Sequence, residues 1–214
     1  MIKRYLKETS YIMKKTAITL LMTTAMISAK AQNFQFGIKA GVNFSKESKT
    51  EVEREVKDQE HKFRQGLHIG GIVAYTINKQ WELEGNLMYS QQGYKEHISS
   101  LGYNGSTIYS IRSNYINLPI TIKFYPLEHF YVELGPQLGF LISKKHKVQG
   151  EGNITKYIPL KPNHFDLSLF CGLGYKFSNN IFLEGRYIHG LNNAYKNVAL
   201  SKNRNLQFSI GYLF

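Results

Sequence analysis

The sequence predicts an all-β protein, an eight-stranded antiparallel up-and-down transmembrane β-barrel that follows an N-terminal signal peptide. Three observations predict this fold: eight segments with alternating apolar and polar residues, connections that alternate between long and short, and a targeting segment at the N-terminus. A strand turns successive side chains to opposite faces, so alternation gives each segment one apolar and one polar face. The clearest case is 205–214, whose apolar row runs from Leu206 to Phe214.

The N-terminal segment has the three parts of a secretory signal peptide. A lysine pair follows Met13, an apolar stretch covers 16–28, and a small-x-small triplet ends at Ala31. We expect residues 1–31 to be a signal peptide cleaved near Ala31 and Gln32. A spanning helix is disfavoured because the apolar core is too short for one.

The mature chain, residues 32–214, is expected to form the outer-membrane β-barrel domain. Residues 1–12 are either an upstream extension of the signal peptide or precede a true start at Met13. The chain has 214 residues, a formal net charge of +12 and one cysteine. One cysteine excludes an internal disulfide, and Cys171 stands in an apolar row, which predicts a buried or lipid-facing side chain.

The alternating segments follow one another along the chain. Residues 34–44 alternate without exception, 66–76 and 81–90 are joined by the tight turn 78–80, and 116–124 is rich in isoleucine. In the last of these, Pro119 predicts a bulge or irregularity, because proline donates no hydrogen bond to a sheet. The remaining segments are 130–140, 165–177, 181–187 and 205–214, with tight turns at 126–129 and 178–180.

The four long connections are polar and are interpreted as exposed loops. They cover 45–65, 93–113, 143–163 and 190–204. In the first of them, extension of the flanking strands or a short helix also fits the sequence. Strict alternation of long and short connections is typical of an outer-membrane barrel with short periplasmic turns and long extracellular loops.

An internal repeat supports the same architecture. A glutamate follows each short turn closely and is itself followed by glycine, as in Glu84-Gly85, Glu184-Gly185, and Glu133 with Gly135. The spacing of about fifty residues corresponds to one double hairpin rather than to a solenoid repeat.

Alternation alone does not separate a membrane barrel from a soluble lipocalin-like barrel, whose apolar row points inward. Three features favour the membrane: a polar row rich in glycine, which suits a narrow lumen, the export signal, and aromatic residues near the short turns. These aromatic residues, expected to form a girdle at one rim, are Phe34, Tyr75, Trp81, Phe124, Tyr125, Phe130, Phe177 and Phe214.

Three sequence stretches carry a resemblance to a known family. They are 115–119 leading into Lys123-Phe124-Tyr125, Gly135-Pro136 with Gly139, and 183–193, which reads LEGRYIHGLNN. With them the mature chain resembles the outer-membrane β-barrel (porin family, PorT-like) proteins of Bacteroidetes. The resemblance implies an eight-stranded barrel in the outer membrane and transfers no catalytic residue.

Charged residues in the polar rows are the main candidate site, a charge network inside the lumen. Cations and carboxylates nearly balance, as a closed lumen requires, because an unpaired buried charge is costly. A polar or proton-conducting pore and a salt-bridged plug both fit, and the small lumen of eight strands favours the plug. The network comprises Lys39, Glu82, Glu84, Lys123, Glu133, Asp166, Lys176, Glu184 and Arg186.

No cofactor, metal site or catalytic residue is predicted. The histidines at 61, 97, 146 and 189 fall on loops or near the outer rim, and no two of them have ligand-like spacing. The motifs G-x-S-x-G and H-E-x-x-H are absent. We therefore expect a non-enzymatic protein with a structural or surface-binding role through its long loops. A narrow transport pore or secretion-accessory barrel is the alternative, and a lipid-modifying barrel enzyme ranks third.

The expected partners follow from location and charge. Lysines of 143–163, with Lys196, Lys202 and Arg204, make the presumed outer face basic, which suits lipopolysaccharide phosphates, polysaccharide or an acidic partner. An extracellular ligand or envelope protein stays open, and nucleic acid is not expected. Residues 205–214 should pair with 34–44 and bring Phe214 beside Phe34. Terminal Phe214 resembles the signal by which the barrel assembly machinery recognises its clients.

Overall fold

The computed structural model describes residues 33–48, 59–99, 106–149, 161–195 and 201–214. The predicted signal peptide, its cleavage site and the alternative start at Met13 lie outside these residues. Within the described part of the chain, no helix is long and apolar enough to cross a membrane.

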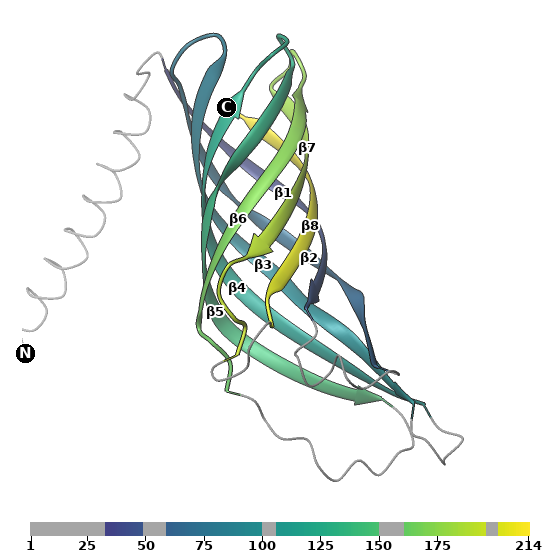
Figure 1. Ribbon diagram of the computed structural model, residues 1–214. Coiled ribbons are helices and arrows are strands. Elements are labelled where there is room, and N and C mark those ends of the chain that lie inside the picture. The colour runs from purple at the N-terminus through teal and green to yellow at the C-terminus, as the bar shows by residue number, and fades with distance from the viewer. Residues whose placement is uncertain (1–32, 49–58, 100–105, 150–160, 196–200) are drawn as a thin grey trace, which may run out of the picture. The chain divides into compact units, whose positions relative to one another are not determined.

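Eight antiparallel strands close into one barrel, as predicted, and each strand pairs with its neighbours in sequence (Figure 1). The barrel is closed by the first and last strands, which pair from Gly37 and Leu213 to Glu47 and Asn203. Closure leaves no open sheet edge, which a bilayer would not tolerate. The strands are β1 Phe34–Glu47, β2 Gln59–Thr76, β3 Trp81–Ser99, β4 Ser106–Phe124, β5 Phe130–Gln149, β6 Phe165–Lys176, β7 Ile181–Gly190 and β8 Asn203–Leu213.

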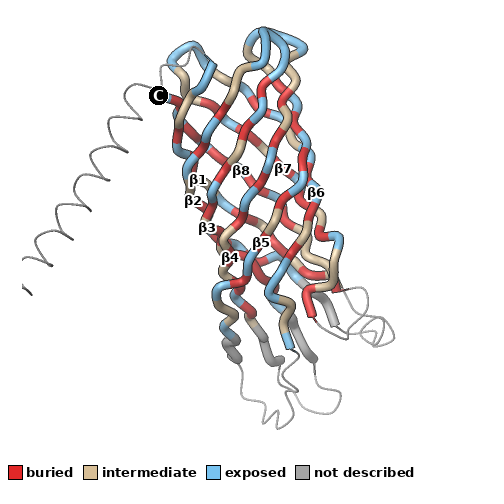
Figure 2. The backbone as a smooth tube through the Cα atoms, turned by 90° about the vertical axis from the view of Figure 1, so that its left-hand side faces the viewer, coloured by how far each residue is buried: buried red, intermediate tan, exposed pale blue. Residues whose placement is uncertain are grey.

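The apolar rows face outward and the polar rows face the lumen. Buried and exposed residues alternate along the strands (Figure 2). The side chains of Ile69 and Leu134 are both 60% exposed, whereas those of Asn43 and Glu84 are fully buried. Apolar side chains outside and polar side chains inside are the reverse of the arrangement in a soluble protein. This confirms the predicted orientation, because only lipid makes an exposed apolar wall favourable. Cys171 lies on the outer face.

Strands β2 to β5 are much longer than predicted. They have 18 to 20 residues, whereas β6 to β8 have 10 to 12. The predicted loop 93–113 is therefore wrong for most of its length, and 143–163 begins as strand. Beyond the lipid both faces of a sheet meet water, so the apolar alternation that marks a strand is lost while its hydrogen bonds continue. The same extension places His61, His97 and His146 on strands rather than on loops.

The irregularity predicted at Pro119 lies elsewhere in β4. The ladders that β4 forms with β3 and β5 keep their register across Pro119. Instead, the register between β4 and β5 shifts between Asn114 and Tyr115. A second shift lies between Phe63 and His68 in β2. Pro119 and Pro136 interrupt pairing locally without an inserted residue.

Three of the aromatic side chains that point into the lumen stand directly opposite a glycine on a neighbouring strand. The pairs are Tyr131 with Gly174, Phe170 with Gly135, and Phe182 with Gly211. A Cβ atom added to Gly174 would lie 2.3 Å from the Tyr131 ring, and one added to Gly211 would lie 2.2 Å from Phe182. Glycine therefore makes the space in which each ring lies flat against the barrel wall.

Aromatic residues also gather near the short turns on the outside of the wall. Trp81 and Phe124 lie 4.8 Å apart between ring centroids, Tyr175 and Phe177 4.9 Å. Tyr125 differs from the expected girdle, because its ring packs on Tyr131 and its hydroxyl donates to Glu82 inside the barrel.

The glycine–aromatic pairs generate the first prediction. Replacing Gly174 with alanine should lower the free energy of unfolding by about 1 to 3 kcal/mol, because the new methyl group overlaps a buried ring. Gly71→Ala is the matched control, since a Cβ there meets nothing within 4 Å. Urea unfolding in detergent micelles measures both variants, and equal midpoints would contradict the packing argument.

Candidate functional site

The candidate site is a layer of ion pairs across the lumen, centred on Arg186 of β7. Its guanidinium forms a fork with the Glu133 carboxylate, with N–O distances of 2.5 and 2.8 Å. The same group reaches Glu184 at 3.2 Å and Glu84 at 3.3 Å. These three glutamates are the repeat positions recognised in the sequence, so the repeat brings its carboxylates together on one cation.

Two lysines extend the layer to the other side of the lumen. Lys39 of β1 lies 2.9 Å from Glu184 and 3.3 Å from Glu84. Lys123 of β4 bonds closely to Glu84 and lies 3.3 Å from Glu82. Seven of the nine candidate residues therefore form one buried layer, with three cations against four carboxylates.

The remaining two candidates stand apart from this layer. Lys176 donates to the side-chain oxygen of Gln35 at 3.0 Å. Asp166 lies towards the opposite end of the barrel, where it accepts hydrogen bonds from Ser168 and from Asn203, the latter at 2.7 Å. Neither forms an ion pair with the layer.

The inward aromatic rings support the cations of the layer. The Lys123 ammonium lies 4.7 Å from the ring centroid of Tyr131 and 5.3 Å from that of Phe182. The Arg186 guanidinium lies 4.9 Å from that of Phe170. Such contacts are favourable when the cation is shielded from water. Beyond the layer, towards the short turns, Ile72, Ala74, Phe182 and Leu213 form an apolar cluster.

A second polar cluster joins the strands at which the barrel closes. His68 of β2 contacts Asn43 Oδ1 through Nδ1 at 2.7 Å and Ser209 Oγ through Nε2 at 2.9 Å. Asn43 also donates to Ser90 Oγ and to the carbonyl of Gln91, both at 2.9 Å. The order Ser–His–Asn is that of a nucleophile, a base and an orienting residue. All three side chains face the lumen and are at most 6% exposed.

Several polar side chains of the lumen, at the level of the layer and beyond it, lack partners. Among the described residues, both amide atoms of Asn86, Asn117 and Asn205 are buried without a hydrogen bond, as is the hydroxyl of Thr121. Near the mouth, Lys144 lies 3.3 Å from Glu47 and 3.9 Å above the ring of Tyr195. The lumen thus holds the apolar cluster beside the ion-pair layer towards the short turns, and polar side chains towards the mouth.

Sequence reasoning missed His68, Phe170 and Phe182. An apolar residue in a polar row breaks the alternation and carries no signal of its own. The signal that could have found the rings is the glycine opposite each of them once the strand register is known. Within the described residues, no cluster of histidine, cysteine or carboxylate side chains could hold a metal ion.

The ion-pair layer generates the second prediction. Arg186→Gln should lower the free energy of unfolding by about 3 to 5 kcal/mol, because it leaves three buried carboxylates without their shared cation. The exposed Arg112→Gln is the matched control and should change it by less than about 0.5 kcal/mol. The gel shift of the folded barrel on heating reports both. Adding Glu133→Gln to Arg186→Gln should restore part of the loss, and a further loss would contradict the pairing.

Comparison with known proteins supplies a family model and several solved structures. Residues 30–196 match the model of the outer membrane protein beta-barrel domain. No curated protein sequence matches the chain. The structure of Neisserial surface protein A is 15% identical, with a TM-score of 0.48, over 84% of this chain and 97% of that one.

Two further structures are similar to a comparable extent. Ail of Yersinia pestis, in complex with the heparin analogue sucrose octasulfate, is 15% identical with a TM-score of 0.44, over 85% of this chain and 99% of that one. OprG of Pseudomonas aeruginosa is 12% identical with a TM-score of 0.39, over 85% and 96%. At such identities the likeness concerns the fold alone.

Proposed function

Because this chain belongs to the outer membrane protein beta-barrel domain family, a family of the outer membrane, we propose that it acts there as a closed, non-enzymatic barrel with a surface-binding outer end. One observation carries the proposal: the lumen is crossed by an ion-pair layer whose seven side chains are all buried. Side chains that bond one another leave no continuous path for a solute.

The proposed orientation follows from the connections. The short turns, which join β2 to β3, β4 to β5 and β6 to β7, face the periplasm in barrels of this kind. The long ends of β2 to β5 then rise beyond the outer leaflet. We propose that this end meets an extracellular ligand or envelope protein, and that Phe214, which is exposed at the periplasmic rim, engages the barrel assembly machinery.

A narrow pore is the second candidate. It is favoured by the buried polar groups of Asn86, Asn117, Thr121 and Asn205, which have no hydrogen-bond partner within the described residues and are suited to water. Water in the outer half of the lumen alone would make a blind vestibule. A pore requires in addition that the ion-pair layer and the apolar cluster below it open.

Single-channel recording in planar bilayers separates these two functions. We expect no discrete conductance steps from the reconstituted protein, because charges paired at 2.5 to 3.3 Å do not exchange partners without a large penalty. A porin reconstituted in parallel verifies the recording. Reproducible steps that scale with protein concentration would refute the closed lumen.

The absence of enzymatic activity is tested at Ser209. Its hydroxyl contacts His68, yet it faces the filled lumen, so a substrate has no access to it. We expect a fluorophosphonate probe to label the wild-type protein no more than the Ser209→Ala variant. Labelling that disappears on this substitution would show an activated serine and favour a lipid-modifying enzyme.

A further inference from the structure

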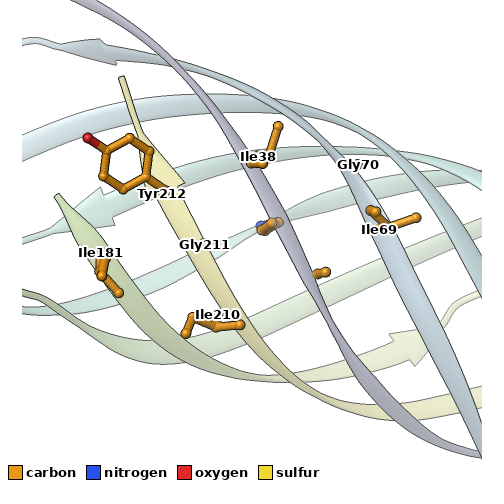
Figure 3. A pocket seen from close by; sticks show the side chains of 9 residues that line it. Ile38, Ile69, Gly70, Ile181, Ile210, Gly211 and Tyr212 are labelled. Atoms are coloured by element: carbon orange, nitrogen blue, oxygen red, sulfur yellow. The ribbon is translucent and has the colours of Figure 1, made fainter.

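Two adjoining hollows open on the outer apolar wall where β8, β1 and β2 lie side by side. Their volumes are about 480 and 510 Å³, and both are lined by Ala40, Ile69 and Ile210. Figure 3 shows the first, with Ile38 and Ile69 on the two sides of the hollow and Ile210 below. We call the two together the wall groove.

The wall groove lies where a small residue interrupts the outward apolar row of β1. Ala40 stands between Ile38 and Val42 in that row and lines both hollows. Large neighbours, such as Ile69 at 60% and Ile210 at 55% exposure, project beyond this floor. An elongated apolar hollow in a lipid-facing wall suits an alkyl chain.

Two cations stand at the outer end of the strands that form this groove. Lys46 of β1 and Arg204 of β8 are direct cross-strand partners, in the same outward row as Val42 and Phe208. Like charges that face each other across a sheet repel. Among the described residues neither has a carboxylate partner, and the buried Nε of Arg204 has no hydrogen-bond acceptor. Glu47 points away from this pair, to Lys144 in the lumen. An anion bound between the two cations would remove the repulsion.

The spacing of groove and cations fits one amphiphilic ligand. Lys46 stands four residues beyond Val42 and six beyond Ala40. At roughly 3.3 Å per residue this is about 13 to 20 Å along the strand, comparable to the length of an acyl chain. A phosphate between Lys46 and Arg204 would therefore let its acyl chain lie in the wall groove below.

We propose that the outward face of β8, β1 and β2 binds one phosphorylated acyl lipid of the outer leaflet, the lipid part of lipopolysaccharide. Lys46 and Arg204 hold its phosphate, and the wall groove holds one of its chains. The assignment rests on the proposed orientation, which sets the cations at the level of the outer-leaflet headgroups. Cation–phosphate pairing supplies the specificity, and burial of the chain supplies affinity without a new conformation of the barrel.

The test measures retention of lipid A by the purified full-length barrel in nonionic detergent, by native mass spectrometry over a lipid titration. The arms compare lipid A, the same lipid after removal of its phosphates, and inorganic phosphate alone. The variants are Lys46→Gln with Arg204→Gln, the groove-filling Ala40→Leu, and the charge-conserving Lys46→Arg with Arg204→Lys. The matched control is Arg112→Gln with Lys145→Gln, a cross-strand cation pair on β4 and β5, away from the strands that form the wall groove.

We expect the Lys46 and Arg204 double variant to bind lipid A about fivefold more weakly for each cation removed. Ala40→Leu should weaken binding, while the charge-conserving pair and the Arg112 and Lys145 control should stay within about twofold of wild type. Equal losses in the control, equal binding of the dephosphorylated lipid, or occupancy by inorganic phosphate in place of the lipid would each overturn the site. The gel shift on heating verifies folding of every variant. Single-channel steps would refute the closed lumen without affecting this result.

Discussion

The interaction on which the rest of the barrel depends is the binding of three glutamates by Arg186. Eight strands enclose a space that only side chains can fill, and the repeat places Glu84, Glu133 and Glu184 in that space at one level. Three carboxylates so close together would repel strongly in a low dielectric. Arg186 with Lys39 and Lys123 turns that repulsion into a connected layer. Five strands contribute to the layer, so it also fixes their positions relative to one another.

Much else in the lumen follows from accommodating these cations. A guanidinium or ammonium that has left water needs contacts on every side, and carboxylates supply only some of them. Tyr131, Phe170 and Phe182 supply others through their ring faces. The rings in turn need space beside the strands of the narrow lumen, and the glycine opposite each ring provides it. Gly135, Gly174 and Gly211 therefore serve the charge layer through the aromatic rings.

Sequence alone predicted the fold wherever the chain lies in lipid, because there the outer face must be apolar and the lumen polar. The strand number, the antiparallel order and the closure by 34–44 with 205–214 all follow from this contrast. Outside the lipid the contrast disappears, which is why 93–113 appeared to be a loop although most of it pairs as β3 and β4.

Within the site, charge and position in the inward row of a strand identified every member of the layer. They did not separate these members from Lys176 and Asp166, which also stand in inward rows but lie elsewhere in the lumen. The alternation along a strand determines that a side chain points into the barrel, whereas strand tilt and register determine its position along the barrel axis. His68 was missed for a related reason: its role depends on Asn43 and Ser209, which are distant in sequence and adjacent only after closure.

The unequal strand lengths have a further consequence for the behaviour of the protein at the cell surface. Within the described residues, the ladder between β5 and β6 ends at Phe140 and Phe165, whereas β5 continues to Gln149 with β4 on its other side. Among the described strands, the upper part of β5 is thus paired on one side only. Such margins recruit strands from other molecules and start aggregation. On this margin Lys144 points inward to Glu47, whereas Lys145 is exposed. A charged side chain on a sheet margin opposes edge-to-edge association, so Lys145 has a consequence beyond the charge of the outer end.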